Sequence, residues 1–320
     1  MERLAIGIDI GGQSSKCGVV TRDGTILEQT VVTSLIDDFD EYLDLLSGAI
    51  KDLIRKTASK GIPAGIGIGA PNANRIDGTI RYAPNLKWAR DSQGKPCVIY
   101  LAKRLEAVTG LHVRITNDAN AAARGEHIYG VAQGIDDFIM ITLGTGVGSG
   151  IISHGRLVYG HDGFAGELGH VCVERDGRQC NCGLKGCLET YASAMGVART
   201  AREFLENDSR ESLLRKLDPE KISSKDIYDA ARQGDAMARE IFAYTGRILG
   251  HALGDFVKFS SPQAIVLFGG LTKSREFFHD EMVQAMNDNL MQVWKGQIEI
   301  LYSSLKESDA AILGASSMVW

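Results

Sequence analysis

The same short order of segments occurs twice in this chain: an apolar strand, a glycine-rich turn, a second strand and, further on, a helix. The first copy, LAIGIDIGGQSSKCGVV, begins at residue 4, and the second, FIMITLGTGVGSGII, begins at residue 138. Glycines bunched at a turn mark backbone that bends sharply or lets a ligand come close. Because the two copies share their order but not their sequence, they predict a pair of architecturally related α/β domains.

The length of 320 residues suits two domains, at roughly 100 to 200 residues each. Apolar residues at helical spacing predict helices over 39–57 and 309–319 and mainly helices over 191–259. GIGIGA at 65–70 resembles a dinucleotide-binding turn, but Pro71 and Asn72 follow where a helix would begin, so a core strand is predicted. We expect a small α/β domain over 1–118, to which the last helix at about 305–320 returns, and a large α/β domain over 119–304.

The composition is that of an ordinary globular chain, with 44% apolar residues, 23% charged residues and a formal net charge of -5. Lysines and arginines form no patch that would neutralise a phosphate backbone, so no nucleic-acid partner is expected. Apolar stretches are interrupted well before the roughly 20 residues that cross a membrane, and the N-terminal segment lacks the apolar core of a secretory leader. We expect a cytoplasmic protein with no membrane anchor.

Both glycine turns offer backbone N–H groups to an anion. The segment DIGGQSSKCG lies between two predicted strands and, by itself, fits either an anion-binding nest or a plain hairpin. The segment GTGVGSG follows a strand in the same way, which favours a clamp for nucleotide phosphates. The Walker pattern GxxxxGK[ST] is absent.

Asn117 and Asp118 lie where the predicted strand HVRIT gives way to a helix. Ligands of open α/β sheets bind at the carboxyl ends of strands, and a carboxylate there can accept the proton of a substrate hydroxyl. The same residue types also cap helices. From these residues alone, the general base and the helix cap both stay open as interpretations of Asp118.

Three cysteines are crowded into CNCGLKGCLE, and GELGH places His170 ten residues before Cys180. One histidine and three cysteines suit tetrahedral zinc, although the Cys-x-Cys spacing is tighter than usual. A disulfide between neighbours would be strained, and a free-thiol cluster would oxidise easily. We therefore expect a structural zinc site, and we expect the scattered cysteines to be packing residues. The expected ligands are His170, Cys180, Cys182 and Cys187, and the scattered cysteines are Cys17, Cys97 and Cys172.

The segments DIGGQSSKCG, NDANAAARGE, LGTGVGSG, GELGH and CNCGLKGCLE, in this order and at these separations, resemble the ROK family of bacterial sugar kinases, repressors and open reading frames. The likeness runs from about Ile6 to Gly314, and GELGH followed by C-x-C-G-x2-G-C-x-E is highly specific. Within the family, the ATP-dependent glucokinase branch looks closest. The resemblance implies an actin-like ATPase (ribonuclease H-like) fold, two α/β domains around a cleft, and a homodimer or homotetramer.

The resemblance also implies ATP- and Mg²⁺-dependent phosphorylation of a hexose at its 6-hydroxyl, with glucose as the closest match. Asp118 would be the general base, and His170 would bind structural Zn²⁺ through one ring nitrogen and a sugar hydroxyl through the other. Asp9 would organise the magnesium ion. The implied sugar ligands are Asn85, Asn117, Asp118, Glu167, His170 and Glu189. The implied nucleotide-binding residues are Asp9, Gly11, Gly12, Lys16, Thr145, Gly146, Gly269 and Gly270.

Rival interpretations differ in the sugar and in whether it is turned over. An N-acetylglucosamine or N-acetylmannosamine kinase and a non-catalytic sugar sensor share the same motifs. Repressors of the family carry a winged helix-turn-helix ahead of the first glycine turn, where this chain has eight residues before Asp9. Gln13 departs from the family, which usually has threonine after the paired glycines, so the choice of nucleotide or phosphate donor stays open.

Overall fold

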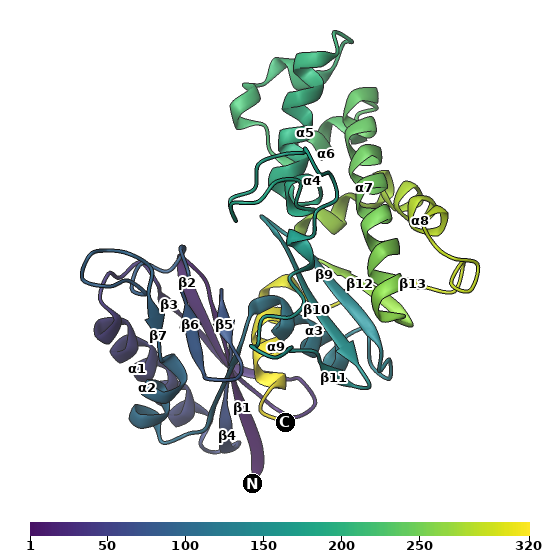
Figure 1. Ribbon diagram of the computed structural model, residues 1–320. Helices are drawn as coiled ribbons and strands as arrows, with labels where there is room; N and C mark the ends of the chain where they lie inside the picture. Colours follow the sequence, from purple (N-terminus) through teal and green to yellow (C-terminus); the bar gives the residue numbers. More distant parts are fainter. The chain divides into compact units, whose positions relative to one another are not determined.

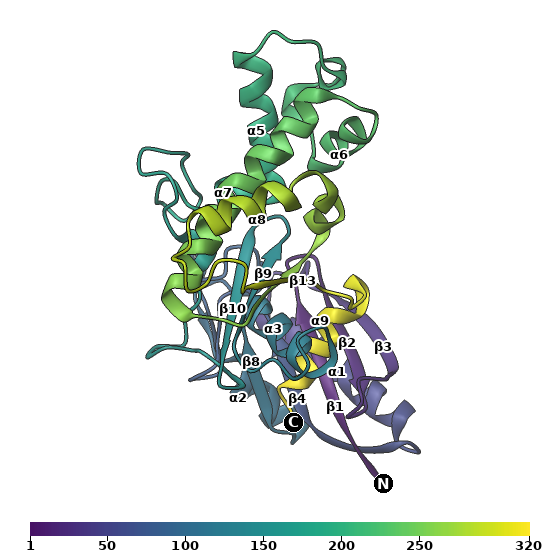
Figure 2. The same cartoon turned by 90° about the vertical axis from the view of Figure 1, so that its right-hand side faces the viewer.

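The structure is a computed structural model that describes the backbone of residues 1–320 and all side chains except those of residues 307 and 308. Figure 1 and Figure 2 show the chain from two directions. Its internal contacts divide it into two compact units. Unit 1 comprises Met1–Asp136, Gly150–Gly166 and Ser303–Trp320, and unit 2 comprises Asp137–Ser149 and Glu167–Tyr302. The division into functional domains at residues 118 and 304 stays a prediction.

Unit 1 is built on a five-stranded sheet with the order β3-β2-β1-β4-β8. Its strands are β1 (Glu2–Ile10), β2 (Ser14–Val20), β3 (Ile26–Thr33), β4 (Gly61–Gly69) and β8 (Val113–Thr116). Strands β1, β4 and β8 run parallel, and β2 and β3 are antiparallel to their neighbours. The carboxyl ends of the parallel strands therefore meet at one edge, where Asp9 is paired with Gly69 and Gly69 with Thr116.

The two faces of this sheet are packed differently because successive strand residues point to opposite sides. Ile6 and Ile66 belong to a buried cluster with residues of α1 (Phe39–Thr57) and α2 (Leu101–Thr109). On the other face, a Cβ on Gly7 or Gly67 would overlap backbone carbonyls of α9 (Glu307–Ser317). Glycine thus lets α9 lie directly on the sheet, and GIGIGA is a core strand, as predicted.

Gly67→Ala should destabilise the protein, because the added methyl group has no room between β4 and the carbonyl of Ala315. Overpacking of this kind costs about 1 to 3 kcal/mol of unfolding free energy. Gly48→Ala is the matched control: Gly48 lies in α1 with no neighbouring atom within 4 Å, so alanine should stabilise by about 0.5 to 1 kcal/mol. Urea unfolding measures both changes, and equal stability of the two variants would contradict this packing.

Two further features complete unit 1. Helix α3 (Asp118–Tyr129) follows β8, and a Cβ on its Gly125 would lie 2.9 Å from Cα of Gly314 in α9. A three-stranded sheet with the order β5-β6-β7 was not predicted, because strands of two or three residues are too short to show a period. Its strands are β5 (Ala73–Asn74), β6 (Thr79–Arg81) and β7 (Val98–Ile99).

The second five-stranded sheet has the order β11-β10-β9-β12-β13. Its strands are β9 (Phe138–Leu143), β10 (Val147–Ser153), β11 (Arg156–Leu157), β12 (Ala264–Phe268) and β13 (Glu299–Tyr302). Strands β9, β12 and β13 run parallel. If the strands of each sheet are numbered 1 to 5 along the chain, both sheets have the same spatial order, 3-2-1-4-5. The predicted architectural duplication is therefore confirmed.

Helices make up most of unit 2, as predicted for 191–259. Helices α7 and α8 lie side by side (Figure 2), and a Cβ on Gly246, Gly250 or Gly254 of α7 would meet the α8 segment. None of the helices that the structure describes is both long and apolar enough to cross a membrane. The helices are α4 (Glu189–Ala192), α5 (Ala194–Asn207), α6 (Ser224–Arg232), α7 (Ala236–Ser260) and α8 (His279–Asp288), with 3₁₀ helices η1 (Leu168–His170), η2 (Leu213–Lys216), η3 (Pro219–Lys221) and η4 (Gly270–Phe277).

Candidate functional site

The first glycine turn connects β1 to β2 at the carboxyl edge of the first sheet. The N–H of Gly11 donates to the carbonyl of Ser14 at 3.0 Å, which closes the turn. Lys16 is the strand partner of Asp9, so the two side chains start from paired positions. A Cβ on Gly12 would lie 2.8 Å from the carbonyl oxygen of Asn85, so the missing side chain lets this turn approach Asn85. The structure therefore brings these predicted residues together.

Asn117 and Asp118 follow β8 at the same edge. Asn117 is the N-cap of α3, and its Oδ1 accepts the N–H of Asn120 at 2.7 Å. Asp118 is the first helical residue, and its Oδ1 accepts the N–H of Ala119 at 2.8 Å. A Cβ on Gly69 would lie 3.7 Å from Cα of Asp118, which places this residue against the end of β4. The cap is Asn117, and the exposed carboxylate of Asp118 is reachable by solvent.

The pKa values of the carboxyl groups of Asp9 and Asp118 are both raised. Burial and then the charge of Asp118 raise the pKa of Asp9 to about 6, while Lys16 opposes this shift. Although solvent reaches Asp118, the protein atoms around it desolvate the carboxylate and raise its pKa, against the hydrogen bond from Ala119. Both groups are therefore held in an environment that disfavours their negative charge.

Asp9→Asn should stabilise the protein near pH 8 and have little effect near pH 4. A carboxyl group with a raised pKa binds its proton more tightly in the folded state, so its ionisation costs folding free energy as the pH rises from about 4 to about 6. The shift corresponds to about 3 kcal/mol, and solvent screening reduces the expected gain to about 1 to 2 kcal/mol. Unfolding free energies at pH 4 and pH 8 test this, and a difference between the variant and the unsubstituted protein that does not grow with pH would contradict it.

In unit 2, the second glycine turn contacts Glu189. The N–H of Gly144 donates to the carbonyl of Gly146 at 3.0 Å, and the N–H of Val147 donates to Oε2 of Glu189 at 3.0 Å. A Cβ on Gly146 would overlap the carboxylate of Glu189. Thr145 is exposed in the same turn. Glycine at position 146 therefore allows Glu189, a predicted sugar ligand, to contact the second glycine turn, which is predicted to bind phosphate.

The turn after β12 lies beside the end of β9. Gly269 has φ +108, and a Cβ there would lie 2.6 Å from the carbonyl oxygen of Leu143. Gly270 follows as the first residue of η4 and is exposed. Because β9 and β12 are parallel, the turns that follow them leave the same edge of the second sheet.

Glu167 and His170 are held by a short 3₁₀ turn. The N–H of His170 donates to the carbonyl of Glu167 at 3.1 Å, and the N–H of Leu168 donates to Oγ of Ser149 at 3.1 Å. Glu167 is exposed, and His170 is half-buried. The turn therefore places an exposed carboxylate next to the histidine of the cysteine cluster.

The four predicted metal ligands, His170, Cys180, Cys182 and Cys187, come together: their donor atoms lie within 4.8 Å of one another. Sγ of Cys182 and Cys187 are 3.6 Å apart, and Sγ of Cys180 is 3.8 Å from Nδ1 of His170. Thiolates at about 2.3 Å from a tetrahedral centre lie about 3.8 Å apart, so the donor set fits one zinc ion.

The loop between these cysteines has the local structure that the cluster needs. The N–H of Cys180 donates to the carbonyl of Leu184 at 2.9 Å, and Gly183 adopts φ +93. Glycine takes this conformation without steric cost, so the chain reverses between the second and third cysteines. Burial, together with the neighbouring thiols, raises the pKa of Cys187 to about 12.

The prediction that Cys172 is a packing residue is wrong. Cys17 is buried and Cys97 is half-buried, but Cys172 is exposed. The physical reason is its position: the backbone of Cys172 forms an isolated antiparallel bridge with that of Cys187, beside the cysteine cluster and outside the apolar core.

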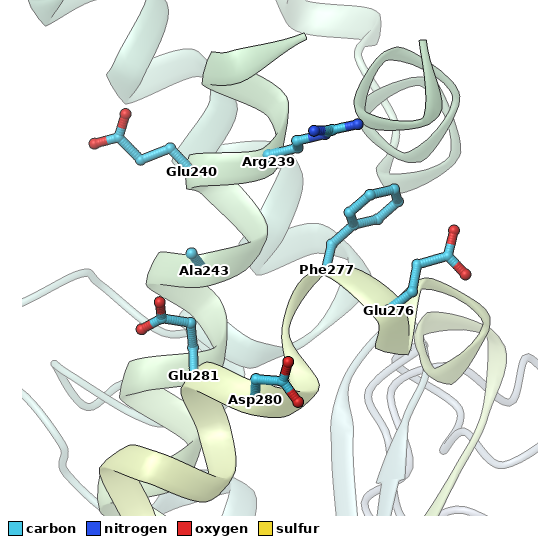
Figure 3. A pocket seen from close by; sticks show the side chains of 7 residues that line it. All are labelled: Arg239, Glu240, Ala243, Glu276, Phe277, Asp280 and Glu281. Atoms are coloured by element: carbon cyan, nitrogen blue, oxygen red, sulfur yellow. The ribbon is translucent and has the colours of Figure 1, made fainter. Parts of the chain in front are cut away.

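A recess of about 580 Å³ in unit 2 lies away from all the predicted residues, between α7 and the η4–α8 segment (Figure 3). Its lining contains four carboxylates and one arginine, Arg239. Two of them are paired with arginines outside the recess, Glu240 with Arg210 at 2.6 Å and Glu281 with Arg247 at 3.3 Å. The recess is an acidic surface hollow and contains none of the candidate site residues. It is lined by Arg239, Glu240, Ala243, Glu276, Phe277, Asp280 and Glu281.

Sequence reasoning missed Arg178, whose side chain is only 6% exposed. It precedes the first cysteine of the loop by two residues and makes an ion pair with Glu203. Arginine is rarely buried without such a partner. Nothing in the local pattern distinguishes Arg178 from the exposed Arg175, because the partners of Arg178 lie further along the chain.

The fold and the arrangement of these motifs define the class of protein. A family model described as the ROK family matches residues 5–320, and the chain belongs to that family. It is 36% identical over 317 residues to a glucokinase of Thermotoga maritima, covering 98% of this chain and 96% of that protein. It is 37% identical over 280 residues to a glucokinase of Halalkalibacterium halodurans, covering 85% of this chain and 82% of that protein.

Among solved structures, the chain is similar to a ROK family glucokinase from Streptomyces griseus in complex with glucose and AMPPNP. The identity is 34%, the TM-score is 0.76, and 98% of each chain is covered. The resemblance and the α/β actin-like ATPase fold that the sequence predicted are confirmed.

Proposed function

We propose that this chain transfers the γ-phosphoryl group of ATP to the 6-hydroxyl of a hexose, with glucose as the preferred sugar. Two relatives named glucokinase match most of the chain, and a similar glucokinase was solved with glucose and AMPPNP. The observation that carries the proposal is Asp118: it lies at the carboxyl edge of the first sheet, it is exposed, and the helix cap beside it is a different residue.

Asp118 is the residue that we propose as general base. Its carboxylate accepts the proton of the sugar 6-hydroxyl while that oxygen attacks the γ-phosphorus and the bond to the β-phosphate oxygen breaks. Burial raises the pKa of Asp118, which makes its carboxylate a better proton acceptor than an ordinary aspartate. Phosphoryl transfer otherwise depends on positioning and on charge stabilisation, so few other reactive side chains are needed.

The proposed sugar ligands supply hydrogen bonds with different donors and acceptors. Asn117 uses its amide oxygen for the helix cap, which leaves its NH₂ group to donate to a hydroxyl. One carboxylate oxygen of Glu189 accepts from Val147, and the other lies 3.9 Å from Sγ of Cys180. Asn85 and Glu167 are exposed and would contribute an amide and a carboxylate.

The two glycine turns and the turn after β12 are the proposed nucleotide-binding elements. Lys16 supplies a positive charge, and backbone N–H groups at glycines offer hydrogen bonds that no side chain obstructs. A magnesium ion bound with ATP would neutralise phosphate charge, and Asp9 is the residue that we propose to hold it, directly or through water. The proposed residues are Gly11, Gly12, Lys16, Thr145, Gly146, Gly269 and Gly270.

The cysteine cluster is a proposed structural zinc site. A bound cation would favour the thiolate forms that burial and mutual repulsion disfavour, which is the usual behaviour of such sites. His170 would bind zinc through one ring nitrogen and keep the other for a sugar hydroxyl. Four protein ligands fill a tetrahedral shell, so the role of zinc is to position the sugar ligands. A homodimer or homotetramer stays a prediction.

The function is tested by coupled ADP release with a panel of sugars. Glucose should give the highest kcat/KM, and the panel also contains mannose, allose, fructose, N-acetylglucosamine and N-acetylmannosamine. Higher kcat/KM with an acylated sugar would correct the sugar, and absence of turnover with every sugar would overturn the kinase proposal. Gln13 is exposed in the first glycine turn, where the family usually has threonine. Turnover measured with polyphosphate in place of ATP tests whether the phosphate donor differs as well.

A further inference from the structure

Arg178 is a buried charge that none of the roles proposed above uses. Its guanidinium donates through Nη1 to the carbonyl of Thr190 at 2.7 Å and to that of Gly196 at 3.2 Å. Nη2 donates to Oγ1 of Thr200 at 2.9 Å, and Nε and Nη2 both donate to the carboxylate of Glu203. The guanidinium of this one side chain thus donates hydrogen bonds to acceptors in both α4 and α5.

Backbone and ring contacts add to this connection. The N–H of Arg178 donates to the hydroxyl of Tyr191, a residue of α4, at 3.0 Å, and the guanidinium lies 4.3 Å from the centre of the Tyr191 ring. The carbonyl of Arg178 accepts the N–H of Gly186 at 2.8 Å. Arg178 therefore joins both ends of the cysteine loop to the short helix that follows it.

This short helix carries a proposed sugar ligand. Helix α4 begins at Glu189, directly beyond Cys187 and Leu188, and has only four residues. So short a helix has little stability of its own, and contacts from outside must fix its orientation. Arg178 holds the carbonyl of Thr190 and the ring of Tyr191, the two residues after Glu189.

We propose that Arg178 is a positioning residue: it fixes α4, and with it Glu189, against the loop that carries Cys180, Cys182 and Cys187. The effect on sugar binding through Glu189 rests on the proposed function, whereas the effect on metal binding by the cysteines does not. A planar guanidinium reaches five acceptors in fixed directions, whereas lysine has a single ammonium group and cannot reproduce this pattern. Residues that orient metal ligands in this way typically contribute about 10- to 100-fold to metal affinity or activity.

The experiment compares Arg178→Lys and Arg178→Gln with Arg175→Gln in the purified, metal-containing protein. Arg175 is the matched control, because it is an exposed arginine in the same loop. Three quantities are measured: the rate of zinc release to a colorimetric chelator, and kcat and KM for glucose. Arg178→Lys should release zinc about 10-fold faster and raise KM about 10-fold, with a much smaller change in kcat. Arg175→Gln should match the unsubstituted protein.

The outcomes separate this inference from the proposed function. The proposed role of Arg178 would be overturned if Arg178→Lys had the zinc release rate and KM of the unsubstituted protein. A fall in kcat alone, or a rise in KM without faster zinc release, would also overturn it. So would purified protein that contains no metal. If Arg178→Gln does not fold, Arg178→Lys carries the test. If the unsubstituted protein phosphorylates no hexose, the proposed function fails, while faster zinc release from Arg178→Lys still supports the coupling between Arg178 and the loop.

Discussion

Asp118→Asn is expected to lower kcat with glucose by about 100- to 10,000-fold, the usual contribution of acid–base catalysis. Asparagine keeps the size and polarity of the side chain, and its amide oxygen can still accept the N–H of Ala119. It has no carboxylate to take the proton of the 6-hydroxyl. Because Asn117 is the helix cap, α3 should form as before, so the loss should come from the chemistry and not from unfolding.

Glu167→Gln is the contrasting variant for this measurement. Glu167 is an exposed proposed sugar ligand, so its replacement should raise KM more than it lowers kcat. Steady-state kinetics and calorimetric titration with glucose distinguish the two cases: Asp118→Asn should bind the sugar and fail to phosphorylate it. Full activity of Asp118→Asn would exclude this carboxylate as the base.

Much of the fold could be predicted from local patterns. The apolar stripe over 39–57 coincides with α1 (Phe39–Thr57), and alternating isoleucine and glycine marked β4, because each pattern repeats with the period of its element. The small sheet of β5, β6 and β7 was missed, because its strands are shorter than a detectable period. Patterns therefore identify elements that are long enough to repeat.

The spacing of residues predicted the site only where they are close in the sequence, and the more distant ones came from the family resemblance. His170 and the cysteines fall within one short segment, and their donor atoms do converge. The hydrogen bond between Val147 and Glu189 joins residues 42 positions apart, and Gly12 approaches Asn85 across 73 positions. The exposure of Cys172 and the burial of Arg178 depend on such distant neighbours too, so composition and spacing alone gave no sign of either.

Cys187→Ser should remove the bound metal and, with it, most of the affinity for the sugar. Cys187 is fully buried within the donor set, and a serine hydroxyl is a poor replacement for a thiolate ligand of zinc. Metal content should fall from about one per chain to a small fraction of that. His170 belongs to the donor set and Glu189 lies beside Cys180, so KM for glucose should rise by at least about 10-fold. Elemental analysis and steady-state kinetics provide both numbers.

Cys172→Ser is the matched control, because Cys172 is an exposed thiol paired by backbone with Cys187 but lies outside the donor set. It should keep both metal and activity. The large apolar core of unit 2 is formed mainly by α5, α6, α7, α8 and the second sheet, so Cys187→Ser should lose the order of the loop before it loses the fold. Circular dichroism near the wild-type signal, with a lower Tm because bound metal stabilises only the folded state, would agree with this. Equal metal loss in both variants would instead mean that general thiol chemistry, and not a four-ligand site, holds the ion.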